Sequence, residues 1–180
     1  YVNFNGNKLC PPYPICLTEY NIGEQDCYYF DNYSLIDDEW YYNSDLNTLE
    51  DFIDENESLT ELQPLLSTHT NWIDNRINDF FLYDMEITTI PESIGNLDSV
   101  DMIYFFDNEI DSIPESIGNL NKLTFLDFGR NNITHIPDTI WGLENLTTLN
   151  FQENQLTSIS DEVCEIYPNL TYELFLFSNF

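Results

Sequence analysis

Basic side chains are scarce in this sequence. Its 180 residues include four Lys and Arg against 33 Asp and Glu, which gives a formal net charge of -29. Nucleic acids and anionic membrane surfaces are bound mainly through basic side chains, so both would repel this chain. We therefore exclude them as partners. Repulsion between the carboxylates also opposes compaction, and we expect salt or divalent cations to favour the folded state.

Long apolar runs are absent as well. No stretch approaches the roughly 20 apolar residues that a membrane helix needs, so we expect no membrane insertion. The sequence begins at Tyr1 without an initiator Met, a basic n-region or a signal-type apolar segment. We expect that the chain was processed or is a piece of a longer protein.

Motifs for catalysis and metal binding are also missing. The two histidines, His69 and His135, lie in unrelated segments, and no Gly-rich phosphate loop or EF-hand spacing occurs. We expect no enzymatic activity and no cofactor. Weak Ca²⁺ binding by the many carboxylates stays open, with no ligands to name.

The four cysteines form an even set whose spacing matches no zinc site. They are Cys10, Cys16, Cys27 and Cys164. With only two histidines to complete a metal site, disulfides are the favoured interpretation. Disulfides persist in oxidising compartments, so we expect an extracellular or cell-surface protein.

A repeat with a period of 23 residues organises most of the chain. "IPESIGNL" stands at 90–97 and 113–120, "IPDTIWGL" follows at 136–143, and "ISDEVCEI" at 159–166. Between these copies the template L-x-x-L-x-L-x-x-N-x-L is filled three times. This pattern is a leucine-rich repeat. Each unit pairs a short strand with a convex return, and the asparagines form a ladder that satisfies backbone groups.

We therefore predict an α/β solenoid with a parallel strand ladder. Residues 77–180 would hold the repeats, with Met85 in place of the asparagine in an imperfect first copy. Helical spacing predicts a helical cap over 46–76, with Asp45 as its N-cap. Residues 28–45 are acidic and aromatic without a clear period, and we expect a connector that packs through its Tyr and Trp side chains.

The first residues have the pattern of an ending. Val2, Phe4, Asn7 and Leu9 fit the later positions of the template, whereas the repeat beginning at Leu170 is expected to stop short of its strand core and asparagine. Joining residue 180 to residue 1 would give one complete final repeat. Residues 1–27 would then be a closing segment.

In this rotated order, 46–180 followed by 1–27, the sequence resembles extracellular leucine-rich repeat proteins of environmental bacteria. The resemblance rests on the "LEDFIDEN" cap, the IPESIGNL repeats and "NKLCPPYPICLTEYNIGEQDC". Three explanations remain open: a tandem array cut in mid-unit, a subunit that completes its neighbour, or a circular permutant. Residues 1–27 could also form a small disulfide cap of their own. The rotated order implies that Cys16 pairs with Cys27, and Cys164 with Cys10 of the next unit.

The register of the repeat places an unusual group of aromatic residues on the concave face, which we define as the outer surface of the strand ladder. So much apolar surface predicts a docking site, formed by Phe81, Tyr83, Tyr104, Phe106 and Phe125. A glycan or the aromatic connector of another copy would suit it. Alternatively, the rings cover one another and bind nothing.

Five sequons offer candidate N-linked glycans if the chain is secreted. They lie at Asn32, Asn56, Asn132, Asn145 and Asn169, and Asn32 and Asn56 are favoured because they lie outside the repeats.

The leading hypothesis is a structural one: a secreted unit that assembles head to tail, through stacking of its repeats, into an extracellular fibre or surface array. Its partners would be copies of itself. The alternative is a binding module that uses the concave aromatic face to recognise a protein or a glycan.

Overall fold

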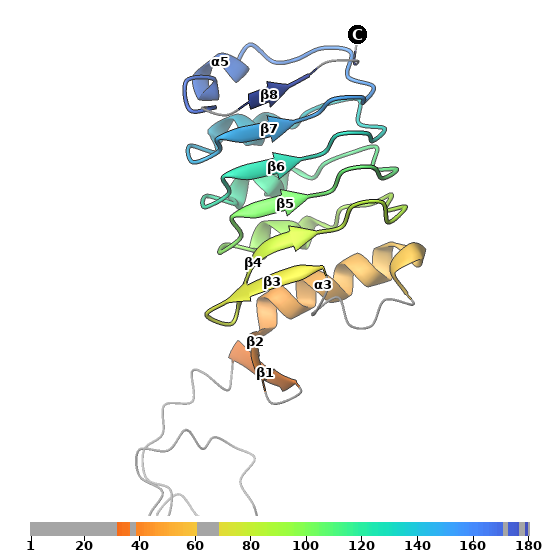
Figure 1. Cartoon of the computed structure of the whole chain (residues 1–180), viewed down its shortest axis with the longest axis vertical. Coiled ribbons are helices and arrows are strands. Elements are labelled where there is room, and N and C mark those ends of the chain that lie inside the picture. Colours follow the sequence, from red (N-terminus) through yellow and green to blue (C-terminus); the bar gives the residue numbers. More distant parts are fainter. Residues whose placement is uncertain (1–31, 37–38, 61–68, 171–172, 177–178, 180) are drawn as a thin grey trace, which may run out of the picture. The chain divides into compact units, whose positions relative to one another are not determined.

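The computed structural model describes residues 32–36, 39–60, 69–170, 173–176 and 179 (Figure 1). The chain divides into two compact units, residues 1–43 and 44–180. The closing segment predicted at 1–27 and residues 61–68 of the predicted helical cap lie outside the described residues.

The described part of the first unit is a short antiparallel hairpin. Strands β1 (Tyr33–Ile36) and β2 (Glu39–Tyr42) pair with Tyr33 opposite Tyr42. The rings of these two tyrosines lie 5.1 Å apart, and Ser34 donates a hydrogen bond to the Asn43 side chain. The connector predicted at 28–45 thus contains a hairpin, which a cross-strand tyrosine pair stabilises without producing an obvious sequence period.

The second unit is a solenoid built on a six-stranded sheet of order β3-β4-β5-β6-β7-β8. Strand β3 (Thr70–Ile73) is antiparallel to β4 (Arg76–Phe81), and each later pair is parallel. The later strands are β5 (Met102–Tyr104), β6 (Phe125–Asp127), β7 (Thr148–Asn150) and β8 (Glu173–Phe175). The predicted parallel ladder is confirmed.

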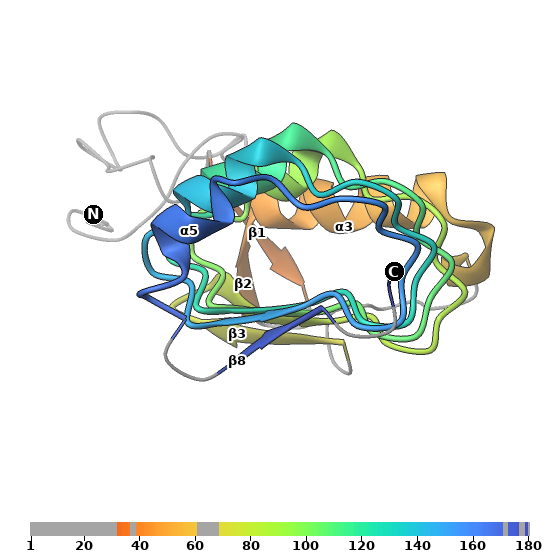
Figure 2. The ribbon, with the colours of Figure 1, turned by 90° about the horizontal axis from the view of Figure 1, so that it is seen from above.

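Helical segments form the opposite side of each turn (Figure 2). The returns are the 3₁₀ helices η2 (Glu92–Asn96), η3 (Glu115–Asn119) and η4 (Asp138–Gly142), followed by the short helix α5 (Val163–Ile166). The first turn is preceded by α3 (Asn43–Glu55) and η1 (Glu57–Leu59).

A column of phenylalanines runs through the core. Each side chain is fully buried, and consecutive rings lie 5.0–5.8 Å apart, as expected for aromatic packing. The column consists of Phe52, Phe80, Phe105, Phe128 and Phe151. Phe52 belongs to α3, so this helix packs its apolar face onto the first repeat.

The asparagine ladder satisfies the backbone at the end of each strand. Asn131 accepts a hydrogen bond from the Ile110 amide and donates to the carbonyls of Phe105 and Phe128. Asn154 repeats these contacts one turn later. Each asparagine therefore connects its own turn to the preceding one.

The final repeat differs from the expectation. It contains a strand core, β8, and an asparagine, Asn179, which donates to the carbonyls of Phe151 and Leu176. Leu149 pairs with Leu174, which lies 25 residues further along the chain instead of the 23 of a regular repeat. Two extra residues therefore precede β8. A strict 23-residue template misses this strand. The prediction that the last repeat lacks its strand and asparagine is wrong.

Glycines set the close spacing of the 3₁₀ helices. A Cβ on Gly95 would lie 2.6 Å from the Ser116 carbonyl oxygen, and one on Gly118 would lie 2.4 Å from the Thr139 Cβ. Only a hydrogen fits at these positions.

Asp45 is not the N-cap of α3. The helix begins at Asn43, and the buried Asp45 carboxylate accepts hydrogen bonds from Arg76 Nε and Nη2, both at 3.0 Å, and from the Ile77 amide at 2.8 Å. Arg76 also contacts Asp98. This network joins the helix to the first strand of the ladder, and a reading of local sequence alone finds a cap instead.

Candidate functional site

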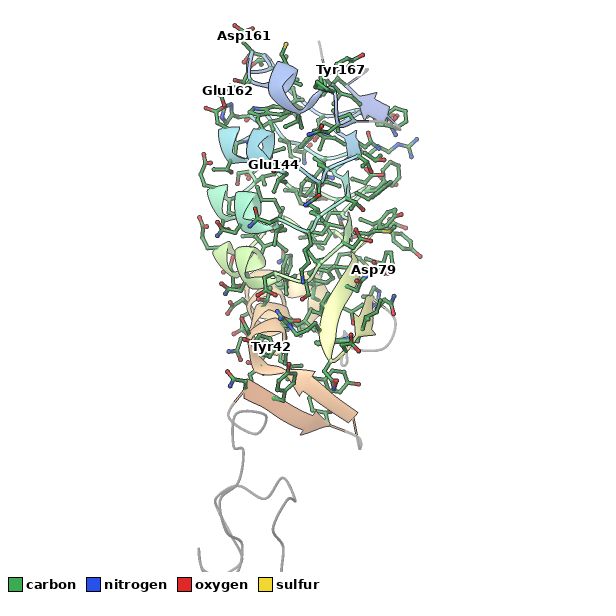
Figure 3. The ribbon with its side chains drawn as sticks, turned by 90° about the vertical axis from the view of Figure 1, so that its left-hand side faces the viewer. Tyr42, Asp79, Glu144, Asp161, Glu162 and Tyr167 are labelled. Atoms are coloured by element: carbon green, nitrogen blue, oxygen red, sulfur yellow. The ribbon has the colours of Figure 1, made fainter. Side chains whose placement is uncertain are left out.

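The concave face consists of aligned rows of side chains, one residue per strand. The parallel register places Asp79, Met102, Phe125 and Thr148 in one row. The next row contains Phe81, Tyr104, Asp127, Asn150 and Phe175. These rows confirm the register that the sequence predicts. Asp79 lies on the strand side of the solenoid, whereas Glu162 lies on the helical side (Figure 3).

Three of the five predicted aromatic residues contact one another. The rings of Phe81 and Tyr104 lie 5.2 Å apart with an interplanar angle of 33°. Tyr104 stacks on Phe125 at 4.4 Å and 26°, diagonally across β5 and β6. All three side chains are half-buried. We call Phe81, Tyr104 and Phe125 the aromatic row.

The two remaining aromatic residues stand apart from the aromatic row. Tyr83 is 60% exposed, which makes it one of the most exposed large apolar side chains among the described residues. Phe106 is half-buried, and the guanidinium carbon of Arg130 lies 5.1 Å from its ring centroid. The expectation of five exposed rings therefore holds fully only for Tyr83, because contacts with neighbouring side chains cover part of the others.

Gly129 makes room for Phe106. It is the next residue in the Tyr83–Phe106 row by the repeat period, and a Cβ there would lie 3.0 Å from Phe106 Cδ2 and 3.0 Å from Asn150 Nδ2. The Gly129 amide donates to Asp127 Oδ1 at 2.8 Å. A side chain at this position would therefore displace either the ring or the amide of Asn150.

Beside these rows runs a column of four charged residues with left-handed backbone. Their φ angles lie between 52° and 59°, and they recur every 23 residues as Asp84, Asp107, Arg130 and Glu153. Arg130 contacts Asp107 at 3.8 Å and Glu153 at 3.3 Å, and its side chain is 48% exposed. The aromatic pattern of the sequence does not point to Arg130; the signal for its role is the 23-residue spacing, which puts one cation between two acids.

Two carboxylates flank the aromatic row. Asp127 lies opposite Tyr104 on the next strand, and Asp79 precedes Phe81 on the same face of β4. Burial raises the pKa of Asp127 above its usual range, although hydrogen bonds from Gly129 and Asn150 act in the other direction. The pKa of Tyr104 is raised by burial and by the negative charges of Asp127 and Asp79. Both carboxylates therefore act on the same phenol.

The structure describes only one of the four cysteines for which disulfides were predicted. Cys164 is exposed and has a free thiol, while Cys10, Cys16 and Cys27 lie outside the described residues, so the disulfide pairing stays a prediction.

The sequon at Asn56 is buried, with its asparagine only 2% exposed. Its amide donates to the carbonyls of Phe52 and Thr89. A glycan at Asn56 is contradicted by this burial. Asn132, Asn145 and Asn169 are exposed and stay candidates, as does the half-buried Asn32.

Within the described ranges, no group of three or more His, Cys, Asp or Glu side chains is arranged to hold a metal ion. Weak Ca²⁺ binding stays a prediction without a site. The same residues contain no helix long and apolar enough to span a bilayer.

Comparison with known proteins supports the assignment of the fold. Residues 107–156 match the family model described as leucine rich repeat. No curated protein sequence matches the chain. Among solved structures, the BIR3–SERK2 complex from Arabidopsis thaliana is similar at 27% identity and a TM-score of 0.57, covering 67% of this chain and 73% of that chain.

Two further structures are similar. The LRR ectodomain of the receptor kinase SOBIR1 from Arabidopsis thaliana shares 20% identity with a TM-score of 0.60, covering 72% of this chain and 77% of that chain. An LRR protein of Leptospira interrogans shares 33% identity with a TM-score of 0.49, covering 52% of this chain; our chain spans 24% of its length. The repeats of the second unit, with their strand ladder and asparagine contacts, thus have the leucine-rich repeat fold, and residues 107–156 carry that family's sequence pattern.

Proposed function

We propose that this chain is a protein-binding module that uses the concave face to recognise a segment of another protein. The aromatic row carries the proposal. Phe81, Tyr104 and Phe125 are half-buried rather than buried, so part of each ring stays open to a partner. Stacking fixes the rings in place before binding, which lowers the entropy that association costs. Aromatic anchors of this kind often dominate binding energies.

The structures that resemble this chain support the proposal without identifying a partner. One of the similar Arabidopsis structures is a complex of two proteins, BIR3 and SERK2. The proposal assigns no catalytic step to the chain. An extracellular location is part of it, and is supported by the even number of cysteines in the sequence.

The proposal is tested on an array of immobilised 15-residue peptides, probed with the whole chain and with the Phe81→Ala/Tyr104→Ala double variant. We expect a set of peptides to bind the natural chain and to lose binding in the double variant. Tyr167→Ala is the matched control, since it removes an aromatic side chain that is 64% exposed and belongs to neither concave row. Equal binding by all three proteins contradicts the proposal. Binding that depends on the aromatic row but appears only on a glycan array favours the glycan alternative instead.

Head-to-tail assembly into an extracellular fibre or array is a second candidate. An unfinished last repeat no longer supports it, because β8 and Asn179 complete that repeat. One observation still favours it: the described sheet ends at β8, where Leu174 and Leu176 are only half-buried. A second copy stacked there would cover them. Sedimentation over a range of concentrations, with and without reducing agent, tests this idea. A monomer under every condition rules it out.

A further inference from the structure

The charges around the aromatic row indicate the chemistry of the partner. Asp79 and Asp127 lie next to the aromatic row in register, and both raise the pKa of Tyr104. Asp84 and Asp107 are exposed and lie in the bends that follow β4 and β5. A partner that contacts these rings must therefore approach through a negative potential.

Little of this charge is neutralised within the chain. The described residues contain three Lys and Arg side chains. Arg76 is held by Asp45 and Asp98 away from the rows, and Lys122 contacts the Ser99 hydroxyl at 3.4 Å. Of these three cations, only Arg130 reaches the concave face. Its charge is opposed there by several carboxylates, so the face stays acidic.

Arg130 also shows how this face holds a cation. Its guanidinium lies over Phe106 and between Asp107 and Glu153, with its side chain 48% exposed. A ring face attracts a cation through its quadrupole, and flanking carboxylates add Coulomb attraction. At the aromatic row, Phe81 and Phe125 lie against the two faces of the Tyr104 ring, so a cation there would be attracted by the carboxylates of Asp79 and Asp127 rather than by a ring face.

We infer that the partner of the concave face is a basic segment of another protein, whose Lys or Arg side chains lie beside Asp79 and Asp127 while its apolar groups contact the aromatic row. This inference rests on the proposed function and names its partner class. A neutral glycan can donate hydroxyl hydrogen bonds to the carboxylates, but it brings no positive charge to offset theirs. An acidic segment would be repelled by the carboxylates, and a divalent ion does not require aromatic rings for its binding.

Arg130 limits this interaction in the natural chain. It occupies the Phe106 ring face and repels an incoming cation. Replacing it with glutamine frees the ring and the two carboxylates, and so creates a second place for a cationic side chain. Arg130 is therefore a specificity-determining residue that reduces the affinity for basic segments.

The test uses two fluorescein-labelled 15-residue peptides that share the same apolar residues and carry either five lysines or five glutamines. Fluorescence anisotropy is measured with the whole chain at low and high NaCl. We expect the lysine peptide to bind about three- to tenfold more tightly at low salt, the range expected for two partly exposed ion pairs. Added salt should remove most of this difference.

Variants assign the difference to named residues. Asp79→Asn/Asp127→Asn should reduce binding of the lysine peptide more than binding of the glutamine peptide. Arg130→Gln should raise the affinity for the lysine peptide about two- to fivefold. Lys122→Gln is its matched control, because it removes the same charge from a residue that does not contact Phe106.

The outcomes separate this inference from the proposed function. Equal affinities for the two peptides, both lost in Phe81→Ala/Tyr104→Ala, overturn the basic-partner inference and leave the binding module intact. Binding of neither peptide also overturns the inference, and the peptide array then decides the proposed function independently. Equal gains from Arg130→Gln and Lys122→Gln would show that overall charge, rather than the Phe106 site, limits affinity.

Discussion

Replacing Asn131 with alanine should destabilise the solenoid far more than its size suggests. The side chain is 6% exposed, and it accepts from the Ile110 amide at 3.0 Å and donates to the carbonyls of Phe105 and Phe128 at 2.9 and 3.0 Å. Each lost hydrogen bond costs about 1 kcal/mol, and more where the remaining group stays buried and unsatisfied. We therefore expect Asn131→Ala to lower the free energy of unfolding by about 2–4 kcal/mol.

The neighbouring asparagine provides the control. Asn132 is exposed, and its carbonyl oxygen accepts a single hydrogen bond, from Gln155 at 2.9 Å. Asn132→Ala should cost less than about 0.5 kcal/mol, as surface substitutions usually do. Urea denaturation followed by circular dichroism measures both variants. Because repeat proteins can unfold in parts, the m-values must agree with that of the natural chain before the free energies are compared. Similar costs for the two variants would refute the reasoning.

Three further predictions concern stability. Gly118→Ala should cost about 1–3 kcal/mol because the added Cβ would overlap the next 3₁₀ helix. Gly142→Ala is the control and should be nearly neutral, because no atom lies within 4 Å of its added Cβ. Equal melting temperatures for the two variants would contradict this. Arg76→Met should cost about 3–5 kcal/mol because it leaves the fully buried Asp45 carboxylate without its cation. The Asp45→Asn/Arg76→Met double variant should recover part of this loss. An unchanged urea midpoint in Arg76→Met would show that the Asp45–Arg76 ion pair does not stabilise the fold. The raised pKa of Asp127 means that the folded state binds the proton of this carboxyl more tightly than the unfolded state does. The stability that this proton contributes is fully present below the ordinary pKa of 3.8 and is lost as pH rises through the folded-state pKa. Asp127→Asn should remove this contribution to the pH dependence of the melting temperature, and an unchanged pH dependence would count against it.

The repeat could be predicted because its constraints are local and periodic. An alternating apolar pattern, an asparagine at a fixed offset and IPESIGNL-type returns specify the strand, ladder and return of every regular turn. The structure differs where the constraint comes from elsewhere in the chain. Asp45 has the sequence context of an N-cap, but Arg76, 31 residues later, makes it a buried ion-pair partner.

The prediction for the final repeat is wrong for a related reason. The two additional residues before β8 shift Leu174 and Asn179 out of the 23-residue template, although their contacts with Leu149 and Phe151 are those of a regular turn. Backbone pairing tolerates such an insertion in the loop, whereas a fixed period does not. The inference of an unfinished repeat thus came from applying a strict period to a solenoid whose loops can vary in length.

The proposed binding surface is harder to predict than the fold because it lies at the positions where the repeats differ. Core positions recur almost unchanged, as in Phe105, Phe128 and Phe151, since each must fill the same space between neighbouring turns. On the concave face, Phe81, Tyr104, Asp127 and Asn150 occupy equivalent positions of successive strands, yet they change from two aromatic rings to a carboxylate and an amide. The fold does not require this sequence of residues, because any outward-facing side chain would suit the strands. Rings on one half of the row and polar groups on the other match a partner that is itself apolar and polar along its length. The differences between repeats therefore carry the proposal of where this chain binds a partner, while their similarities indicate how it folds.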